Sequence, residues 1–403
     1  MRRRWQRSAL CALLVVAGLL APASVGAALA APSFQGITQL PSVGGSRLDG
    51  VGPVVDLPAG VPPPPPQVAT SWLLADVGTG EVLAAQAAHL PLRPASTQKM
   101  LTSLVLLPRL DPAAIYTATP DDANAEGSKV GVVPGATYTV DELFRGMILP
   151  SGNDAAHALA EIGGGQHATV TAMNALALRL QAQDTTAVNP SGLDEDTQWS
   201  SAYDLALIAR AGLAMENFRA YIATARSSFP GAMPTLPGEV RGSFEIANHN
   251  KLLGNYPGAI GVKTGFTSQA RSTFVGAATR DGTTLVVTLM HTGPAAWRDA
   301  AALMDWGFAH GAAVRPVGEL VDPLPSVSTT GPSVAVLSER AQAAGGVAGP
   351  DGAANSWAPG GLGVGPVLGA AALVLVLCGS ALRVRALRRR RPSPRSTVED
   401  ATG

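Results

Sequence analysis

The chain has 403 residues, of which 14% are charged, and its 29 basic and 29 acidic residues give a formal net charge of zero. This length is enough for one or two domains, and the balanced charge gives no indication of nucleic-acid binding. The two cysteines, Cys11 and Cys378, both lie in apolar runs near the ends, so the central part has no cysteine pair for a disulfide and depends on its core for stability.

The two ends of the chain predict an exported, membrane-anchored protein. Residues 1–30 combine arginines, an apolar run and small residues up to Ala30, the pattern of a secretory signal peptide; an uncleaved anchor is the alternative. Residues 361–382 are uncharged and mostly apolar, long enough to cross the ~30 Å core of a bilayer, and the arginines that follow predict a cytoplasmic tail over 383–403. A flexible tail with a basic end is the alternative there.

Two low-complexity segments separate these ends from a central domain at 68–312. Residues 31–67 are rich in proline and glycine and are predicted to form an extended linker. Residues 313–358 are rich in small residues and proline, and they are predicted to form a stalk that leads to the membrane. We therefore expect the folded domain to end at these boundaries.

The central domain begins with a predicted β-hairpin, Val68–Asp76 and Glu81–Gln86, followed by an apolar run after Ser96 that is typical of a buried helix. From about residue 110 to 250 the pattern is mostly helical. The candidate helices in this block are Val140–Leu149, Asp154–Glu161, Ala168–Gln183 and Ala202–Ala214.

Strands return after residue 255, beginning with the short Ala259–Lys263. An Asp-Gly pair between Thr273–Thr279 and Thr283–His291 is a strong hairpin signal, and the helix predicted over Ala295–Phe308 would cover the sheet. This layout predicts an α+β fold. An antiparallel β-sheet, built from both ends of the domain and flanked by helices, would carry an inserted all-helical subdomain, with a cleft between the two parts.

A serine and a lysine stand three residues apart in the segment Pro-Ala-Ser-Thr-Gln-Lys at 94–99. Helical spacing places Ser96 and Lys99 on one face, so the lysine can reach the hydroxyl. The helix N-terminus would favour a developing oxyanion beside Ser96. A serine helix cap and a solvated lysine have the same pattern, so this motif alone leaves both interpretations open.

Two later motifs add to this one. Ser-Gly-Asn-Asp at 151–154 lies between two predicted helices, and Lys-Thr-Gly at 263–265 ends a predicted strand. Each by itself also fits an ordinary turn or helix cap. In this order, on helix, loop and strand, the three match the serine, lysine and Lys-Thr-Gly elements of penicillin-binding proteins and β-lactamases.

On these motifs the chain resembles the low-molecular-mass penicillin-binding proteins of the D-alanyl-D-alanine carboxypeptidase type, over roughly residues 65–310. The matching segments are Pro94–Thr102, Leu149–Ala160, Asn189–Leu207 and Asn248–Phe266. The high usage of alanine, glycine and arginine looks actinobacterial. The resemblance implies the penicillin-binding protein/β-lactamase-like fold. The second, all-β domain of many relatives has no room here, because the region after 311 is too short and too low in complexity.

The resemblance implies catalytic roles for Ser96, Lys99 and Ser151. Ser96 would be the nucleophile and Lys99 its base. A neutral Lys99 needs a pKa lowered from about 10.4 to near 7–8, roughly 3–5 kcal/mol, which burial and the Lys263 ammonium would supply. Ser151 would pass the proton to the leaving amine. No histidine lies in the three motifs, so a Ser-His-Asp triad is not supported.

The resemblance also implies substrate-binding roles. Asn153 would hydrogen-bond the substrate peptide and orient Lys99; a structural amide that bridges the two subdomains is the alternative. Lys263 and Thr264 would bind the terminal carboxylate of the substrate. Gly265 would let the backbone lie close to the ligand. The N–H groups of Ser96 and Phe266 would form the oxyanion hole.

One position departs from the family pattern. The family often has an arginine about ten residues before an aromatic-Gly-Phe in the last helix, to help hold the carboxylate. Here the aromatic is Trp306 and that position is Ala296. Arg298, two residues later, is either a carboxylate ligand or an ordinary surface arginine.

The implied reaction is removal of the terminal D-alanine from a peptidoglycan stem pentapeptide through an acylated Ser96, without metal or cofactor. β-Lactams would acylate the same serine.

A class A β-lactamase is one alternative. Such enzymes deacylate with a glutamate that is followed four residues later by an asparagine, and no glutamate in this sequence has that asparagine. A penicillin sensor or cell-wall scaffold is the other. About twenty residues after Leu382 leave no room for a signalling domain, and a scaffold has no need of all three motifs.

Overall fold

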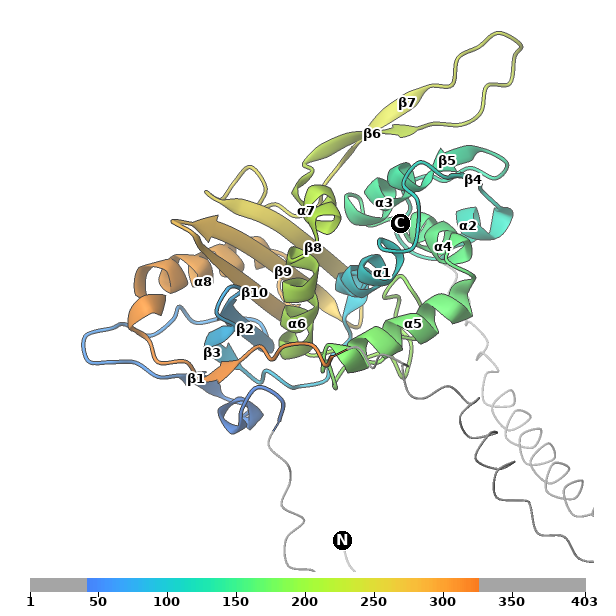
Figure 1. Cartoon of the computed structure of the whole chain (residues 1–403). Helices are drawn as coiled ribbons and strands as arrows, with labels where there is room; N and C mark the ends of the chain where they lie inside the picture. Colours follow the sequence, from blue (N-terminus) through green and yellow to red (C-terminus); the bar gives the residue numbers. More distant parts are fainter. Residues whose placement is uncertain (1–41, 326–403) are drawn as a thin grey trace, which may run out of the picture. The chain divides into compact units, whose positions relative to one another are not determined.

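The computed structural model describes residues 42–325 of the chain (Figure 1). The predicted signal peptide, transmembrane segment and cytoplasmic tail lie outside the described residues. Among the helices of the described part, none combines the length and the apolar character that a membrane span requires.

A seven-stranded antiparallel sheet forms the centre of the fold, in the order β1-β3-β2-β10-β9-β8, with β11 also paired to β3. Strands from the two ends of the domain meet where β2 pairs with β10, Leu74 opposite Val287. The predicted sheet is therefore confirmed. The strands are β1 Pro53–Val55, β2 Ser71–Asp76, β3 Glu81–Gln86, β8 Ala259–Thr267, β9 Arg271–Arg280, β10 Thr283–Thr292 and β11 Gly318–Glu319.

Helices cover both faces of this sheet. Leu74 packs with Leu303 of α8 (Ala296–His310) in one core cluster, whereas the neighbouring Leu73 packs with Leu205 of α6 (Ala202–Leu213) in another. Successive strand residues point to opposite faces, so this split places α8 and α6 on opposite sides of the sheet, as Figure 1 shows. Because both faces are covered, the central strands are mostly apolar rather than alternating.

The second part of the domain is mostly helical and packs beside the sheet (Figure 1). Its elements are η2 Ala95–Gln98, α1 Lys99–Leu106, α2 Pro120–Asn124, α3 Val140–Ile148, α4 Asn153–Ile162, α5 Gln166–Arg179 and α7 Glu216–Ala223. The four predicted helices at 140–214 are present within a few residues of their predicted bounds.

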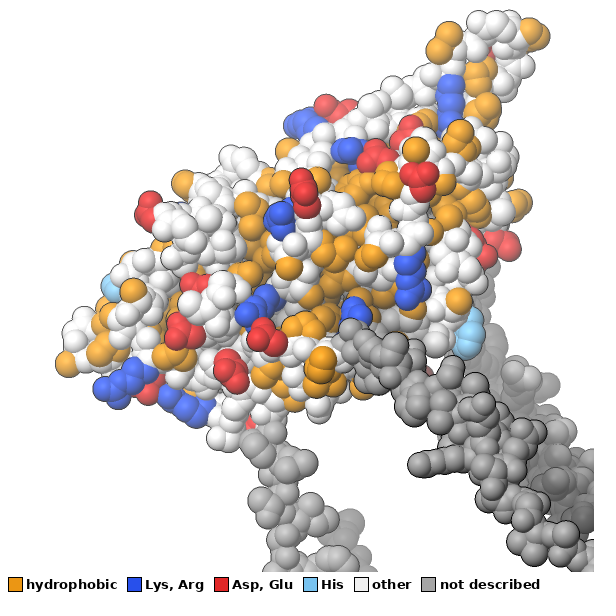
Figure 2. Space-filling view, viewed as in Figure 1, with side chains coloured by type: hydrophobic (Ala, Val, Ile, Leu, Met, Phe, Trp, Pro, Cys, Tyr) orange, Lys and Arg blue, Asp and Glu red, His pale blue; other side chains and the backbone are white. Residues whose placement is uncertain are grey.

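The sequence pattern predicted an all-helical inserted part, and this detail is wrong because the part also contains two short strand pairs. The strands β4 (Ile115–Thr117) and β5 (Thr137–Thr139) pair within it, and β6 (Arg226–Pro230) pairs with β7 (Ser243–Ala247). The β6–β7 hairpin extends away from the body and carries exposed apolar side chains (Figures 1 and 2). These strands are three to five residues long, too short for a period-2 pattern to stand out in the sequence.

The folded domain also extends beyond the predicted boundaries of 68 and 312. In the segment predicted as a linker, β1 pairs with β3, and the Trp306 Nε1–H donates to the Pro62 carbonyl at 2.8 Å. In the segment predicted as a stalk, β11 pairs with β3. These contacts are largely made by the backbone, so the low-complexity composition gave no sign of them, and they cover strand β3, which would otherwise expose an edge.

Candidate active site

Ser96 lies in a tight 3₁₀ turn, η2, that leads directly into α1. The preceding Ala95 is fully buried with φ = 48°, a left-handed conformation that a non-glycine residue adopts at a cost. The turn is held because Thr97 Oγ1 and Thr273 Oγ1 both donate to the Pro94 carbonyl, at 2.6 and 2.8 Å. The surrounding packing thus holds Ser96 in one place.

Lys99 is buried beneath Ser96 and has three polar neighbours. Its Nζ lies 2.9 Å from Ser96 Oγ, 2.6 Å from Asn153 Oδ1 and 2.8 Å from the Ser191 carbonyl oxygen. The last two atoms can only accept hydrogen bonds, so they take the two N–H groups of a neutral amine. The nitrogen lone pair then faces the Ser96 hydroxyl, which is the arrangement a general base requires.

The surroundings also favour the neutral amine. The pKa of Lys99 lies well below its ordinary value because the side chain is buried and, to a smaller extent, because Lys263 is close. Asp154 acts in the opposite direction. Burial also lowers the pKa of Lys263, to about 7. The predicted neutralisation of Lys99 therefore has burial as its main cause and Lys263 as the second.

Asn153 holds Lys99 and a neighbouring loop together. Its Nδ2 donates to the Glu126 carbonyl at 2.6 Å, which fixes the amide with Oδ1 towards Lys99. Its own N–H donates to the Ser128 carbonyl at 2.7 Å. The side chain thus orients the base and holds the loop at 126–132, while its hydrogen bond to the substrate peptide stays a prediction.

Asp154 fixes the same loop and does not act as the helix cap that the Ser-Gly-Asn-Asp motif by itself would also fit. It lies inside α4, whose N-cap is Gly152, and it is fully buried. Its carboxylate accepts hydrogen bonds from the N–H groups of Val130, Gly131 and Val132 at 2.8–3.0 Å. The Ser-Gly-Asn-Asp motif therefore attaches the loop to α4.

Ser151 has an unusual conformation beside Ser96. Its φ is 66°, it is 6% exposed, and its Oγ has no hydrogen-bond partner among residues 42–325. A buried hydroxyl without a partner costs free energy, and such sites are often completed by a ligand. The hydroxyl is thus available to a molecule in the adjoining cavity.

The Lys-Thr-Gly motif lies on β8, the edge strand of the sheet beside η2. Lys263 is 1% exposed, and its Nζ donates to the Thr264 carbonyl at 3.0 Å. A Cβ atom on Gly265 would lie 2.7 Å from the Ser96 backbone nitrogen and would also meet Thr273. Glycine is needed here because the strand backbone lies directly against the serine turn.

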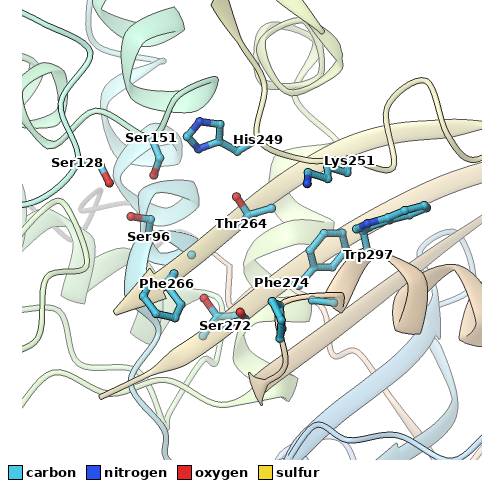
Figure 3. Close-up of a pocket in the computed structure, with 14 residues that line it drawn as sticks. Ser96, Ser128, Ser151, His249, Lys251, Thr264, Phe266, Ser272, Phe274 and Trp297 are labelled. Atoms are coloured by element: carbon cyan, nitrogen blue, oxygen red, sulfur yellow. The ribbon is translucent and has the colours of Figure 1, made fainter. Parts of the chain in front are cut away.

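A cavity of about 240 Å³ opens between the sheet and the helical part (Figure 3). The predicted residues Ser96, Ser151, Thr264, Gly265 and Phe266 line it, with Lys99, Asn153 and Lys263 buried around Ser96. Its other lining residues are Ser128, His249, Lys251, Ser272, Thr273, Phe274, Pro294, Ala296 and Trp297. The predicted cleft is therefore present, and the three motifs meet in it.

Comparison with known proteins identifies the family. Residues 60–293 match the D-alanyl-D-alanine carboxypeptidase family. The chain belongs to this family. It is 44% identical over 259 residues to the D-alanyl-D-alanine carboxypeptidase DacB2 of Mycobacterium tuberculosis, covering 62% of this chain and 86% of the relative. The D-alanyl-D-alanine carboxypeptidase of Streptomyces sp. (strain K15) is 34% identical over 247 residues, covering 58% and 84%.

Solved structures of D-alanyl-D-alanine carboxypeptidases and related enzymes share the fold. The D-alanyl-D-alanine carboxypeptidase from M. tuberculosis H37Rv has a TM-score of 0.59 at 43% identity, covering 66% of this chain and 99% of the other. The Streptomyces K15 DD-transpeptidase has a TM-score of 0.58 at 30% identity, covering 62% and 100%. The fold and the family predicted from the sequence are thus confirmed.

Arg298 is the one predicted site residue that lies away from this carboxypeptidase-family site. It stands in the first turn of α8, its guanidinium 4.6 Å from the centre of the Trp297 ring, and it does not line the cavity. Ala296 lines the cavity instead. The structure thus favours the surface interpretation of Arg298.

Several site residues were not predicted. Thr273 and Ser272 lie opposite Gly265 and Phe266 in the β8–β9 ladder, so extending the predicted strand past the Lys-Thr-Gly motif would have found them. The Ser191 carbonyl belongs to the backbone, so the residue type at this position gives no indication that it contacts Lys99. His249 and Lys251 lie in a segment matched by family resemblance, but no spacing rule connects them to Ser96.

Possible metal ligands cluster elsewhere. Within residues 42–325, His89, Asp184 and Asp204 form a group with ligand atoms within 4.8 Å of one another. His89 Nδ1 already lies 2.7 Å from Asp184 Oδ2, and none of the three lines the cavity at Ser96.

Proposed function

We propose that the protein is a serine-type D-alanyl-D-alanine carboxypeptidase that removes the terminal D-alanine from peptidoglycan stem pentapeptides. The observation that carries this proposal is the Lys99 Nζ placed 2.9 Å from Ser96 Oγ, with its other two neighbours restricted to accepting hydrogen bonds. Membership of the D-alanyl-D-alanine carboxypeptidase family supports the substrate class.

In the first half-reaction, Ser96 Oγ attacks the carbonyl carbon of the penultimate D-alanine while Lys99 takes its proton. Backbone N–H groups of Ser96 and Phe266 stabilise the oxyanion. Lys99 returns the proton through Ser151 to the leaving nitrogen, so the peptide bond breaks and free D-alanine departs. Asn153 keeps Lys99 aligned through both transfers.

In the second half-reaction, water attacks the ester on Ser96 and Lys99 takes a proton from it. The ester bond breaks, Ser96 Oγ recovers a proton, and the shortened peptide leaves. A β-lactam follows the first half-reaction, but its leaving nitrogen stays tethered to the acyl group, which slows attack by water. Penicillin binding is consistent with the family and follows from the same chemistry.

The test is D-alanine release from a peptide that ends in D-Ala-D-Ala, measured with the full-length protein and with Ser96→Ala. Release by the wild type and none by the variant would support the proposal. Rapid, repeated β-lactam hydrolysis with no D-alanine release would instead favour a β-lactamase. Absence of both release and covalent penicillin labelling would contradict an enzymatic role.

The proposal extends to location: an exported catalytic domain anchored in the membrane by residues 361–382. The signal-peptide pattern at 1–30 and the arginines after the apolar run support it, and so does the substrate, which lies outside the cytoplasm. Membrane fractionation of the full chain, beside a chain that stops at residue 358, tests it. Equal release of both chains into the soluble fraction would contradict the anchor.

A further inference from the structure

Two segments that lie far apart in the sequence meet beside the serine turn. The loop at 189–194 supplies the Ser191 carbonyl, which accepts a hydrogen bond from Lys99 at 2.8 Å. The strand β8 ends with Thr267 and carries Phe266, whose N–H stabilises the oxyanion in the proposed reaction. The base and the oxyanion hole therefore both depend on how this loop and this strand end are placed relative to each other.

The loop is cross-linked internally around Asn189. Its Oδ1 accepts hydrogen bonds from the N–H groups of Ser191, Gly192 and Leu193 at 2.8–3.2 Å, and its Nδ2 donates to the Leu193 carbonyl at 2.9 Å. Gly192 has φ = 84°, and a Cβ atom there would collide with the Ala95 carbonyl. Glycine alone combines this conformation with so close an approach. The loop thus keeps its own shape and lies directly against the serine turn.

The end of β8 has less support of its own. Because β8 is an edge strand, its ladder with β9 holds it from one side, and this ladder ends where Thr267 pairs with Arg271. The Phe266 side chain is 72% exposed, so its packing does little to fix the backbone. Chain segments with few buried contacts open more easily than central strands. The position of the Phe266 N–H therefore depends on what else holds Thr267.

Asp194 supplies such a contact from the loop. Thr267 Oγ1 donates to Asp194 Oδ1 at 2.9 Å and accepts from the Ala270 N–H at 2.9 Å. Both side chains are half-buried, and hydrogen bonds to a carboxylate are among the stronger ones. Within residues 42–325, no basic side chain forms an ion pair with Asp194. Asp194 thus connects the loop to the strand, whereas its acidic neighbours Glu195 and Asp196 are exposed.

We infer that Asp194 is a positioning residue that fastens the end of β8 to the loop through Thr267. This contact keeps the Phe266 N–H and the Ser191 carbonyl aligned on Ser96. The inference rests on the proposed function, whose acylation step uses both groups. Neither Asp194 nor Thr267 lines the cavity, so neither is placed to contact the substrate. Their effect should therefore fall on the rate of acylation and not on binding.

A double-mutant cycle in the full-length protein tests this contact through acylation of Ser96 by a fluorescent penicillin. Asp194→Ala removes the acceptor, and Thr267→Val removes the hydroxyl while keeping the shape of the side chain. Each variant should lower the acylation rate constant about tenfold, and the double variant should lose no more than either, because all three lack the same hydrogen bond. Stopped-flow traces at increasing penicillin concentration should show unchanged affinity of the complex that precedes acylation.

Two conservative variants separate this role from a general effect on stability. Asp194→Asn keeps an oxygen acceptor and Thr267→Ser keeps the hydroxyl, so both should acylate within about threefold of the wild type. Glu195→Ala is the matched control, since this neighbouring carboxylate is exposed. It should acylate at the wild-type rate.

Four results would overturn the inference. Wild-type acylation by Asp194→Ala and Thr267→Val would show that the contact is not needed. Additive losses in the double variant would mean that the two side chains act separately. A loss confined to the affinity of the first complex would move their effect to binding. A loss in Asp194→Asn or Glu195→Ala as large as in Asp194→Ala would indicate an effect of charge and not of this hydrogen bond.

The penicillin readout also separates this inference from the proposed function, because it needs no D-alanine release. If the wild type releases no D-alanine but the cycle shows the expected coupling, the inference stands and the proposed function fails. If the wild type releases D-alanine and both single variants acylate at the wild-type rate, the proposed function stands and the inference fails.

Discussion

Two buried polar clusters in this domain respond to burial in opposite ways. Around Lys99, burial lowers the pKa of a base beside a hydroxyl that opens to a cavity. In the side cluster, formed by His89, Asp184 and Asp204, burial and the neighbouring Asp184 raise the pKa of Asp204 to about 7. The neighbouring groups and the access to solvent thus decide what burial of a titratable side chain does. It supports catalysis in the first cluster and makes stability depend on pH in the second.

Among the substitutions considered for the cluster around Lys99, Lys99→Arg should reduce acylation the most. Arginine keeps a positive charge and cannot act as a base near neutral pH. The rate of Ser96 acylation by a β-lactam should fall about a thousandfold, within the range that general bases contribute. Stopped-flow acylation measures it, with Lys129→Arg as the control because that lysine is exposed. An acylation rate within tenfold of the wild type would contradict the assignment of Lys99 as the general base.

The side cluster predicts a decline in stability as pH rises. Asp204 has a folded-state pKa of about 7 against 3.8 unfolded, so its contribution is complete below 3.8 and is lost as pH rises through about 7. The pKa of His89 is also raised, although burial alone would lower it, because Asp184 accepts its hydrogen bond, and this acts in the same direction.

Asp204→Asn should flatten this dependence. The difference between 3.8 and about 7 corresponds to roughly 4 kcal/mol in the free energy of unfolding. Urea denaturation of the wild type and the variant between pH 4 and 8 measures it, with Asp121→Asn, an exposed carboxylate, as the control. A wild-type profile that rises over this range would refute the assignment.

Asp154→Asn tests how far the first cluster depends on its loop. The variant loses a charged acceptor for three backbone N–H groups, two of them on the buried residues Val130 and Val132. The free energy of unfolding should fall by about 3 kcal/mol. Urea denaturation measures this loss, and Asp121→Asn again serves as the control. Wild-type stability would mean that the loop stays attached without the carboxylate.

Gly265→Ala tests the contact between β8 and the serine turn. A Cβ atom 2.7 Å from the Ser96 nitrogen must displace one backbone or the other. Misplacement of this size should reduce acylation about a hundredfold with little loss of stability. Gly242→Ala is the matched control, because nothing lies within 4 Å of its Cβ position. Equal acylation rates in both variants would show that the turn tolerates the shift.

Local chemistry made much of the fold predictable. The Asp-Gly hairpin between β9 and β10 is present, with φ of 48° at Asp281 and 83° at Gly282, because this turn needs left-handed residues and the pair supplies them. Apolar periodicity located the long helices, and β3 has its predicted bounds. The Pro/Gly-rich and low-complexity ends of the domain were missed because their pairing with β3 is made by the backbone.

The sequence by itself determined which reactive groups the protein has and their order: Ser96, Lys99, Ser151 and the Lys-Thr-Gly motif. Only the tertiary structure decided what these groups contact. The Ser191 carbonyl lies 92 positions from Lys99 along the chain, and Lys251 lines the cavity whereas Arg298 does not. Residue type and short spacing are local properties, whereas burial, pKa and ligand contacts arise from segments that meet only in the folded chain.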